Sequence, residues 1–159
     1  MLEIRPCTVE HVLELAELWM EYMIDQGDDP LFTYLDLAGS TEGFTRIIEG
    51  YLNKEPEGFL MALEGEEVIG FAVSFRDAFG PNYVSRRKIG QIQAVHVKRG
   101  SRRRGVASKL VNASIDYLRS CGCSIVIAEA DERNEASVGL LERLGFGERG
   151  RLVNYMRDV

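Results

Sequence analysis

The stretch from Ile89 to Ser120 limits the possible folds most, because its pattern changes from strand to helix across one short loop. Two sets of side chains alternate from Ile89 to Val97, and their β-branched content is typical of a strand. From Gly105 onward apolar residues recur at helical spacing, which predicts an amphipathic helix. The stretch therefore predicts a strand, a loop and a helix in direct succession.

The loop between this strand and this helix is strongly basic. Five of the seven residues before Gly105 are cations: Lys98, Arg99, Arg102, Arg103 and Arg104. A helix start leaves backbone N–H groups without acceptors and carries partial positive charge. Because Gly105 has no side chain to keep a phosphate away from that backbone, the loop predicts a pyrophosphate cradle. The alternative is an exposed basic turn before a surface helix.

Two common phosphate-binding loops do not fit this sequence. A Walker A loop requires Lys and Ser or Thr directly after its second glycine, whereas Val106 and Ala107 follow Gly105. A Rossmann fingerprint requires a second glycine two residues after the first, and Gly100 has none there. The loop must therefore belong to another class of phosphate site if it binds phosphate.

The rest of the chain supplies a sheet and further helices. Strands are predicted at 2–5, 58–63, 67–75, 89–97, 123–130 and 146–158, and helices after Thr8, after Ser40 or Thr41, from Gly105 and from Asn134. The predicted order is β-α-α-β-β-β-α-β-α-β. This order implies an α/β (α+β) fold with a mixed central sheet and helices on both faces. With 159 residues, the chain is expected to form one domain, residues 1–159.

The charge balance narrows the class of ligand. A net charge of −6 argues against a general nucleic-acid binder, so the local basic loop indicates one small anionic ligand. Cys121 and Cys123 lack the spacing of metal ligands, and no metal is expected. From the charged first residues and the lack of a long apolar run we expect no signal peptide and no membrane-spanning helix, so no membrane partner is expected and the expected location is the cytoplasm.

Three segments of the chain resemble one superfamily. Arg102-x-x-Gly105-x-Ala107 is similar to the acyl-CoA-binding motif Q/R-x-x-G-x-G/A of the GCN5-related N-acetyltransferase (GNAT) superfamily. Asn134 to Phe146 resembles its pattern N-x-x-A…L-Y-E-x-x-G-F, and the hairpin EGEEVIGFA also agrees in order and spacing. The resemblance covers nearly the whole chain and implies the GNAT fold.

The resemblance implies that acetyl-CoA is the cosubstrate and that it lies along this loop. The implied cofactor-binding residues are Val97, Lys98, Arg99, Arg102, Arg103, Arg104, Gly105, Val106, Ala107, Ser108 and Asn134. Val97 and Arg99 stand where strand-end backbone groups bind the acetyl and pantetheine part. Asn134 stands where a side chain contacts the pantetheine arm or orders the following helix. Two parallel strands that splay at Val97 and Glu129 would leave backbone groups for pantetheine amides to satisfy.

Glu129 is the first candidate for the catalytic base. It closes a predicted apolar strand, and it precedes Asn134 by the spacing seen in the similar ribosomal-protein alanine N-acetyltransferases. The alternative is a carboxylate that faces water or caps a loop.

Gln91 stands where histone-type members have a glutamate, and glutamine cannot act as a base. His96 is another candidate, since an unperturbed imidazole titrates near neutrality, but it points opposite to Val95 and Val97, which favours a packed or surface histidine.

Leu141 is the clearest departure from the family pattern. Many members have a tyrosine there as the acid that protonates the leaving thiolate, and leucine has no proton to give. Tyr155 resembles a residue of the alanine acetyltransferases and could fill this role; the alternative is an aromatic residue packed on the sheet. Water could also supply the proton, or the thiolate could leave unassisted.

Together the residues and the resemblance imply an acetyl-CoA-dependent N-acetyltransferase. Its acceptor would be a primary amine of a small molecule or of a peptide N-terminus, attacking the thioester directly. Two other functions stay open: a non-catalytic acyl-CoA-binding or sensing module, and a module for other phosphate-bearing ligands. Acidic residues around the first loop (Asp25, Asp28, Asp29 and Asp36) suit a cationic acceptor, or else a solvated loop. A homodimer is implied by the resemblance alone.

Overall fold

The structure of the chain is a computed structural model that describes residues 1–26, 40–78, 87–153, 155 and 157. These residues form a five-stranded sheet in the order β1-β2-β3-β4-β5. The strands are β1 (Leu2–Pro6), β2 (Phe59–Glu64), β3 (Glu67–Phe75), β4 (Ile89–Val97) and β5 (Ile125–Ala128). The α-helices are α1 (Val12–Asp25), α2 (Ser40–Lys54), α3 (Val106–Ser120) and α4 (Glu135–Arg143). Neighbouring strands pair antiparallel except β4 and β5, which are parallel.

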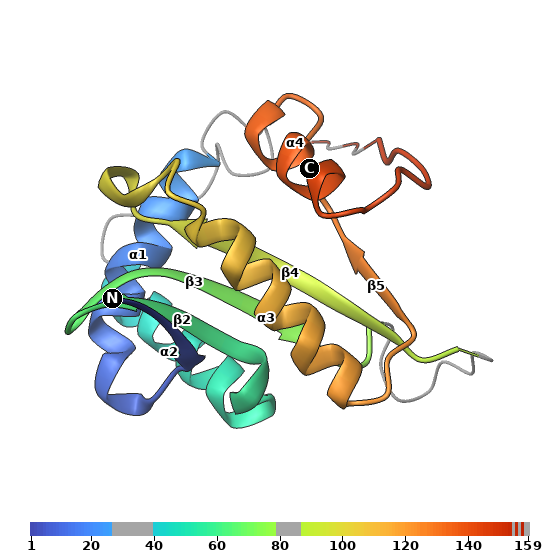
Figure 1. Ribbon diagram of the computed structural model, residues 1–159. Helices are drawn as coiled ribbons and strands as arrows, with labels where there is room; N and C mark the ends of the chain where they lie inside the picture. The colour runs from blue at the N-terminus through green and yellow to red at the C-terminus, as the bar shows by residue number, and fades with distance from the viewer. Residues whose placement is uncertain (27–39, 79–86, 154, 156, 158–159) are drawn as a thin grey trace.

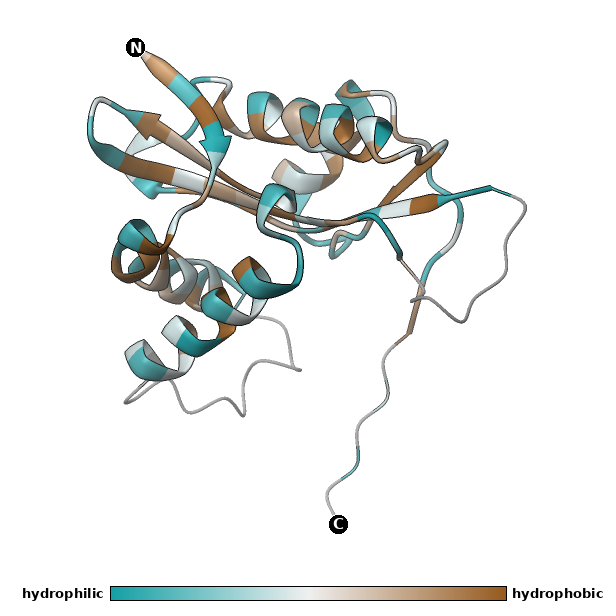
Figure 2. Ribbon diagram, turned by 90° about the horizontal axis from the view of Figure 1, so that it is seen from below, coloured by the Kyte–Doolittle hydropathy of each residue, from teal (hydrophilic) through white to brown (hydrophobic). Residues whose placement is uncertain are grey.

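Helices cover both faces of this sheet (Figures 1 and 2). On one face α1 and α2 pack on an aromatic core, in which Trp19 stacks on Phe71 of β3 with ring centroids 5.1 Å apart. On the other face α3 buries Leu110 completely against β-strand residues that include Ile69 and Val97. The apolar stripes of these helices therefore meet the alternating apolar residues of the strands, as the sequence pattern predicts.

The predicted mixed sheet with helices on both faces is confirmed, and β4 has the predicted bounds. The final strand predicted over 146–158 is wrong, because none of the described residues in that segment belongs to a strand. Gly147 and Gly150 weaken extended pairing, and Leu152 and Val153 are exposed instead of forming an apolar face. Among the described helices, none combines the length and apolar character that a membrane span requires.

The sheet opens where β4 continues beyond the end of β5. The two strands pair from Ile89 with Ile125 to Ile92 with Ala128, and no residue of β5 faces Gln93–Val97. A bulge lies at the same point, because Ala94 pairs with Val73 of β3 while Ile92 pairs with the next residue, leaving Gln93 unopposed. A bulge bends its strand and increases the local twist. Among the described residues, no strand covers this edge of the second half of β4, where Arg102 Nε donates to the carbonyl of Val97 at 2.8 Å, so the rest of the edge is open to a ligand.

Candidate active site

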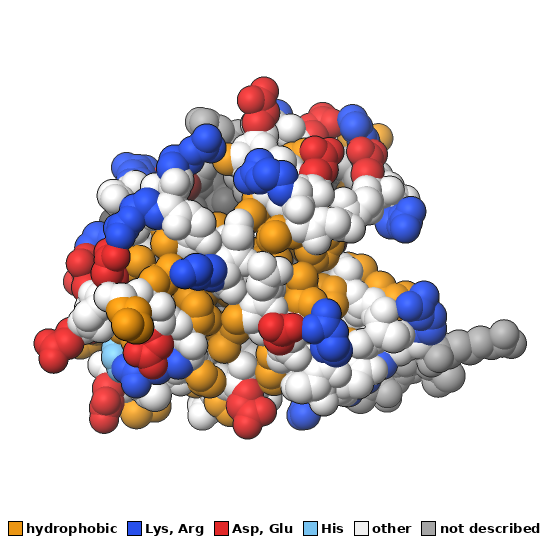
Figure 3. Space-filling model, viewed as in Figure 1, with side chains coloured by type: hydrophobic (Ala, Val, Ile, Leu, Met, Phe, Trp, Pro, Cys, Tyr) orange, Lys and Arg blue, Asp and Glu red, His pale blue; other side chains and the backbone are white. Residues whose placement is uncertain are grey.

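A cleft of about 1300 Å³ occupies the opening between β4 and β5. Its walls come from the second half of β4, the start of α3, the chain after β5, α4 and the end of α1. In the space-filling view the surface is hollowed between α4 and α3, with hydrophobic side chains on the floor (Figure 3). The lining combines apolar side chains with polar and charged ones, so the cleft suits a small molecule that has both apolar and charged parts.

The free edge of β4 presents backbone hydrogen-bonding groups to this cleft. The N–H of Lys98 donates to the carbonyl of Ile69 on β3 at 2.9 Å. Because neighbouring residues of a strand direct their N–H groups to opposite edges, the N–H of Val97 is directed toward the cleft. An extended chain with amide groups, such as a pantetheine arm, could pair with this edge as an added strand.

The N-terminus of α3 supplies a second set of donors. The first helical hydrogen bond joins the N–H of Lys109 to the carbonyl of Gly105 at 3.1 Å, so the N–H groups of Val106, Ala107 and Ser108 have no acceptor within the helix. Gly105 has φ 79° and no atom within 4 Å of the position that a Cβ would take. This open, left-handed position leaves room for a phosphate group at the helix dipole. The residues present therefore fit a CoA pyrophosphate.

The basic loop contributes fewer free charges than its composition predicts. Carboxylates hold four of its five cations: Glu67 holds Lys98, Asp25 holds Arg99 and Arg102, and Glu64 holds Arg104. The remaining cation is Arg103, which lines the cleft, has φ 64° and has no ion pair among the described residues. The ion pairs therefore act mainly to fix the loop to α1 and to the β2–β3 hairpin. Arg103 is the cation best placed to meet an anionic ligand.

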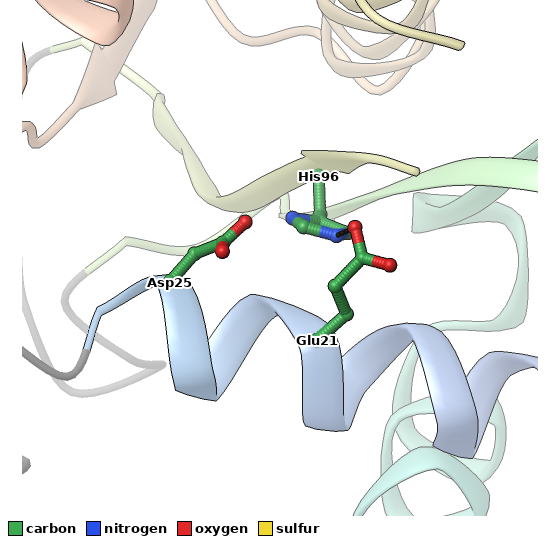
Figure 4. A group of neighbouring side chains, drawn as sticks. All are labelled: Glu21, Asp25 and His96. Atoms are coloured by element: carbon green, nitrogen blue, oxygen red, sulfur yellow. Dashed lines mark hydrogen bonds and ion pairs between the residues drawn. The ribbon is translucent and has the colours of Figure 1, made fainter. Parts of the chain in front are cut away.

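Two carboxylates of α1, Glu21 and Asp25, lie beside His96 of β4 (Figure 4). Burial acts to raise the pKa of Asp25, but hydrogen bonds from Arg99 and Arg102 outweigh it and hold that pKa below its usual value. Potential ligand atoms of Glu21, Asp25 and His96 lie within 4.8 Å of one another. Two guanidinium groups already share the Asp25 carboxylate, and their charge would oppose a bound cation. The cluster therefore suits a hydrogen-bonded network better than a metal ion.

The predicted catalytic and pantetheine-binding residues lie around the cleft, except Arg99 and Tyr155, which do not line it. Glu129 directly follows β5, lines the cleft and is exposed, while Leu141 lines the α4 wall. Asn134 caps α4, its side-chain oxygen accepting from the N–H of Ser137 at 3.1 Å, so it does order the following helix. Tyr155 is 92% exposed and is not among the residues that line the cleft. The structure thus brings Glu129 and Asn134 together with the loop and leaves Tyr155 apart.

Sequence reasoning missed the contribution of α1 to this site. Glu21 accepts hydrogen bonds from the N–H of Arg99 at 2.9 Å and from His96 at 3.1 Å, which joins α1 to the end of β4. The sequence did contain a signal for this contact. Glu21 and Asp25 lie near the C-terminus of α1, where the helix dipole disfavours negative charge, so a cationic partner for them could be expected. Of the acidic residues predicted around the first loop, Asp28, Asp29 and Asp36 lie outside the described residues, and Asp25 is held by the loop.

Comparison with known proteins agrees with this geometry. Residues 12–146 match the Acetyltransferase (GNAT) family. N-alpha-acetyltransferase 30 of Schizosaccharomyces pombe is 28% identical over 116 residues, which cover 72% of this chain and 75% of that protein. Mycothiol acetyltransferase of Streptomyces scabiei is 29% identical over 105 residues, covering 66% of this chain but only 30% of that protein.

Solved structures with bound CoA share the fold. Aminoglycoside N-acetyltransferase AAC(6')-Iy in complex with CoA aligns with a TM-score of 0.75 and 20% identity, over 100% of this chain and 96% of that one. The NatC complex bound to Gag peptide and CoA aligns with a TM-score of 0.69 and 22% identity, over 95% and 87%. Since the family match covers most of the sequence, this chain belongs to the GNAT acetyltransferase family and is an N-acetyltransferase.

Proposed function

We propose that this protein binds acetyl-CoA in the cleft and transfers the acetyl group to a primary amine of a small molecule or of a peptide N-terminus. The observation that carries the proposal is that two sets of free backbone donors border the same cleft. One set lies along the edge of β4 and the other at the start of α3. An extended amide chain that ends in a pyrophosphate can satisfy both sets at once. The bound CoA in the related structures supports the same assignment.

The cofactor contacts follow from this arrangement. The backbone from Arg103 to Ser108 would hold the pyrophosphate, with the charge of Arg103 added to the α3 dipole. The free edge of β4 would hold the pantetheine amides as far as Val97, with Asn134 on the opposite wall. Lys98, Arg99, Arg102 and Arg104 would act through their ion pairs, by keeping the loop in place.

The chemistry needs an amine with a free electron pair and a place for two protons. Acetyl-CoA would supply the thioester whose acyl carbon the amine attacks. The N–H of Val97 would stabilise the negative charge that develops on the thioester oxygen. Glu129 would accept a proton from the amine nitrogen as the new bond forms. The C–S bond of the thioester would then break, the leaving thiolate would take up a proton, and the amide and the free thiol would leave the cleft by its open side.

Acetyl-CoA binding is tested by calorimetry on a matched pair of loop variants. Arg103→Gln is expected to weaken acetyl-CoA binding about tenfold, because it removes one charge-assisted hydrogen bond to phosphate. Arg104→Gln removes a charge already held by Glu64 but keeps a side-chain donor for that carboxylate, so the loop should stay in place and the affinity is expected to change less than twofold. Absence of binding by the unchanged protein would refute the proposal.

Acetyl transfer is tested with two amine probes, neamine and a short peptide with a free N-terminus. The related proteins support both classes, since one was solved with a CoA–acetylneamine bisubstrate analogue and another with a peptide. Acetylation of one probe, detected by mass spectrometry, is expected and would identify the acceptor class. Leu141 favours one alternative, a CoA-binding module without activity, because it lines the cleft and has no proton to donate. Tight acetyl-CoA binding without transfer to amines would support that alternative.

Tyr155 remains the proposed proton donor for the leaving thiolate. This role requires the segment that carries Tyr155 to reach the α4 wall, since its side chain lies outside the cleft in the structure. Tyr155→Phe is expected to lower kcat about tenfold without a change in acetyl-CoA affinity. An unchanged kcat would assign the proton to water.

A further inference from the structure

His96 is a buried residue of a core strand, yet its side chain borders the cleft. It lies in the half of β4 that pairs with β3 but not with β5, and it is only 5% exposed. Its ring packs between Tyr22 of α1 and Phe71 of β3, each with ring centroids 5.9 Å away. The histidine is therefore held rigidly at the wall of the site.

Glu21 fixes the orientation of this ring. One carboxylate oxygen, Oε1, lies 3.1 Å from His96 Nε2 (Figure 4). The same oxygen lies 2.9 Å from the backbone nitrogen of Arg99, whose N–H donates to it. Since a carboxylate only accepts, Nε2 carries the proton, and Nδ1 of the neutral ring keeps its lone pair. Among the described residues Nδ1 has no hydrogen-bond partner, and it is not one of the fully buried atoms that lack a partner. The ring therefore keeps a free acceptor.

The amine is expected to approach from the face on which His96 lies. The phosphate-binding start of α3 covers one face of the sheet, where Val97 packs against α3. His96 and Ala94 belong to the other face, where α1 contributes Tyr22 and Asp25 to the cleft. A cofactor that enters from the α3 side leaves the α1 side for the acceptor.

We propose that His96, oriented by Glu21, accepts a proton from the bound acceptor ammonium, directly or through one water, before the attack on the thioester. This inference rests on the proposed function. The N–H bond of the ammonium breaks, its electron pair stays on nitrogen, and the proton binds Nδ1. The imidazolium is stabilised by Glu21 and later releases the proton to solvent, while Glu129 takes the second proton during bond formation. A carboxylate that orients a histidine base is a recurrent catalytic arrangement.

The charges around the ring agree with a base that is neutral at pH 7. Burial lowers the pKa of His96 below its ordinary value of 6.5, and Arg102 acts in the same direction. Glu21 and Asp25 of α1 act to raise the pKa of His96 without cancelling the effect of burial. Tyr22 of α1 also faces the ring, and Phe71 of β3 adds no charge. His96 would therefore lose activity as a base only when the pH falls below this lowered value.

The first experiment is the pH dependence of kcat/KM for acetyl transfer to neamine and to a peptide with a free N-terminus. We expect His96→Gln to lower kcat/KM about tenfold at pH 7.5, less than a positioned base usually contributes because water also accepts ammonium protons. The loss should shrink as the pH rises toward the pKa of the amine, and acetyl-CoA affinity should stay within twofold. His11→Gln, which changes the other histidine of the chain, is the matched control and should behave as the unchanged protein.

A second variant and a spectroscopic measurement make the test independent of one substitution. Glu21→Gln should move the acidic limb of the profile to lower pH, because it removes a charge that raises the pKa of His96. In ¹⁵N-histidine NMR of the unchanged protein, His96 should be the Nε2–H tautomer at pH 7.5. In the spectrum, a proton on Nδ1 or a charged ring at pH 7.5 would overturn the inference. So would a His96→Gln variant whose kcat/KM and acidic limb of the pH profile equal those of the unchanged protein. If the unchanged protein acetylates neither probe, the proposed function itself fails, which is a distinct result.

Discussion

Gly105→Val is expected to abolish measurable acetyl-CoA binding, with a loss of affinity of at least about hundredfold. The residue has φ 79°, a conformation in which a β-branched side chain is strained by about 1–2 kcal/mol. Its Cβ would also enter the open space in front of the α3 N-terminus, where the pyrophosphate is proposed to lie. Isothermal titration of the variant with acetyl-CoA measures the loss.

A second glycine provides the control for strain. Gly122 has φ 84° and no atom within 4 Å of its Cβ position, but it lies in the turn after α3 and does not line the cleft. Gly122→Val should lower the melting temperature by about 2–8 °C, as Gly105→Val should, and leave acetyl-CoA affinity unchanged. Equal affinity losses in the two variants would mean that strain, and not contact with phosphate, explains the effect.

The local parts of the fold and site could be predicted because their signals lie within a few residues. The alternation from Ile89 to Val97 and the turn at Gly105 are each visible in a short window, and both match β4 and the start of α3. The cap of α4 by Asn134 is equally local. Such features depend on backbone geometry and side-chain spacing, which a sequence displays directly.

The charge distribution of the loop could not be predicted, because its partners lie far away in the chain. Asp25 meets Arg99 and Arg102 only after α1 packs beside the end of β4, and Glu64 meets Arg104 only through the hairpin. Composition alone therefore overestimated the free positive charge. The same long-range contact places Glu21 beside His96, so a strand histidine becomes part of the site.

The failed final strand has a different cause. Its sequence contains enough apolar residues to suggest extended structure, but a strand also needs an edge to pair with and a face to bury. Gly147 and Gly150 interrupt the segment, and the described residues around them are exposed and have no strand partner. Strand pairing depends on two segments, so the apolar pattern of residues 146–158 alone could not show whether they form a strand.

Glu129→Gln is expected to lower kcat/KM about 10²–10³-fold, within the range that a positioned base contributes, while acetyl-CoA affinity stays within twofold. The amide keeps the size and hydrogen-bonding oxygen of the side chain but cannot take a proton from the amine. Glu129 lines the cleft directly after β5, so its replacement should affect the reaction and not the fold. Steady-state kinetics with the better of the two amine probes measure the effect.

Glu132→Gln is the matched control, because Glu132 is an exposed carboxylate three residues later that pairs with Arg151 and does not line the cleft. It should leave kcat/KM within twofold.

A double variant of Glu129 and His96 then separates their roles. Successive protons on two acceptors predict losses that multiply, whereas a shared proton predicts a double variant no slower than the slower single variant. A Glu129→Gln protein with full activity would leave His96 or water as the acceptor of both protons.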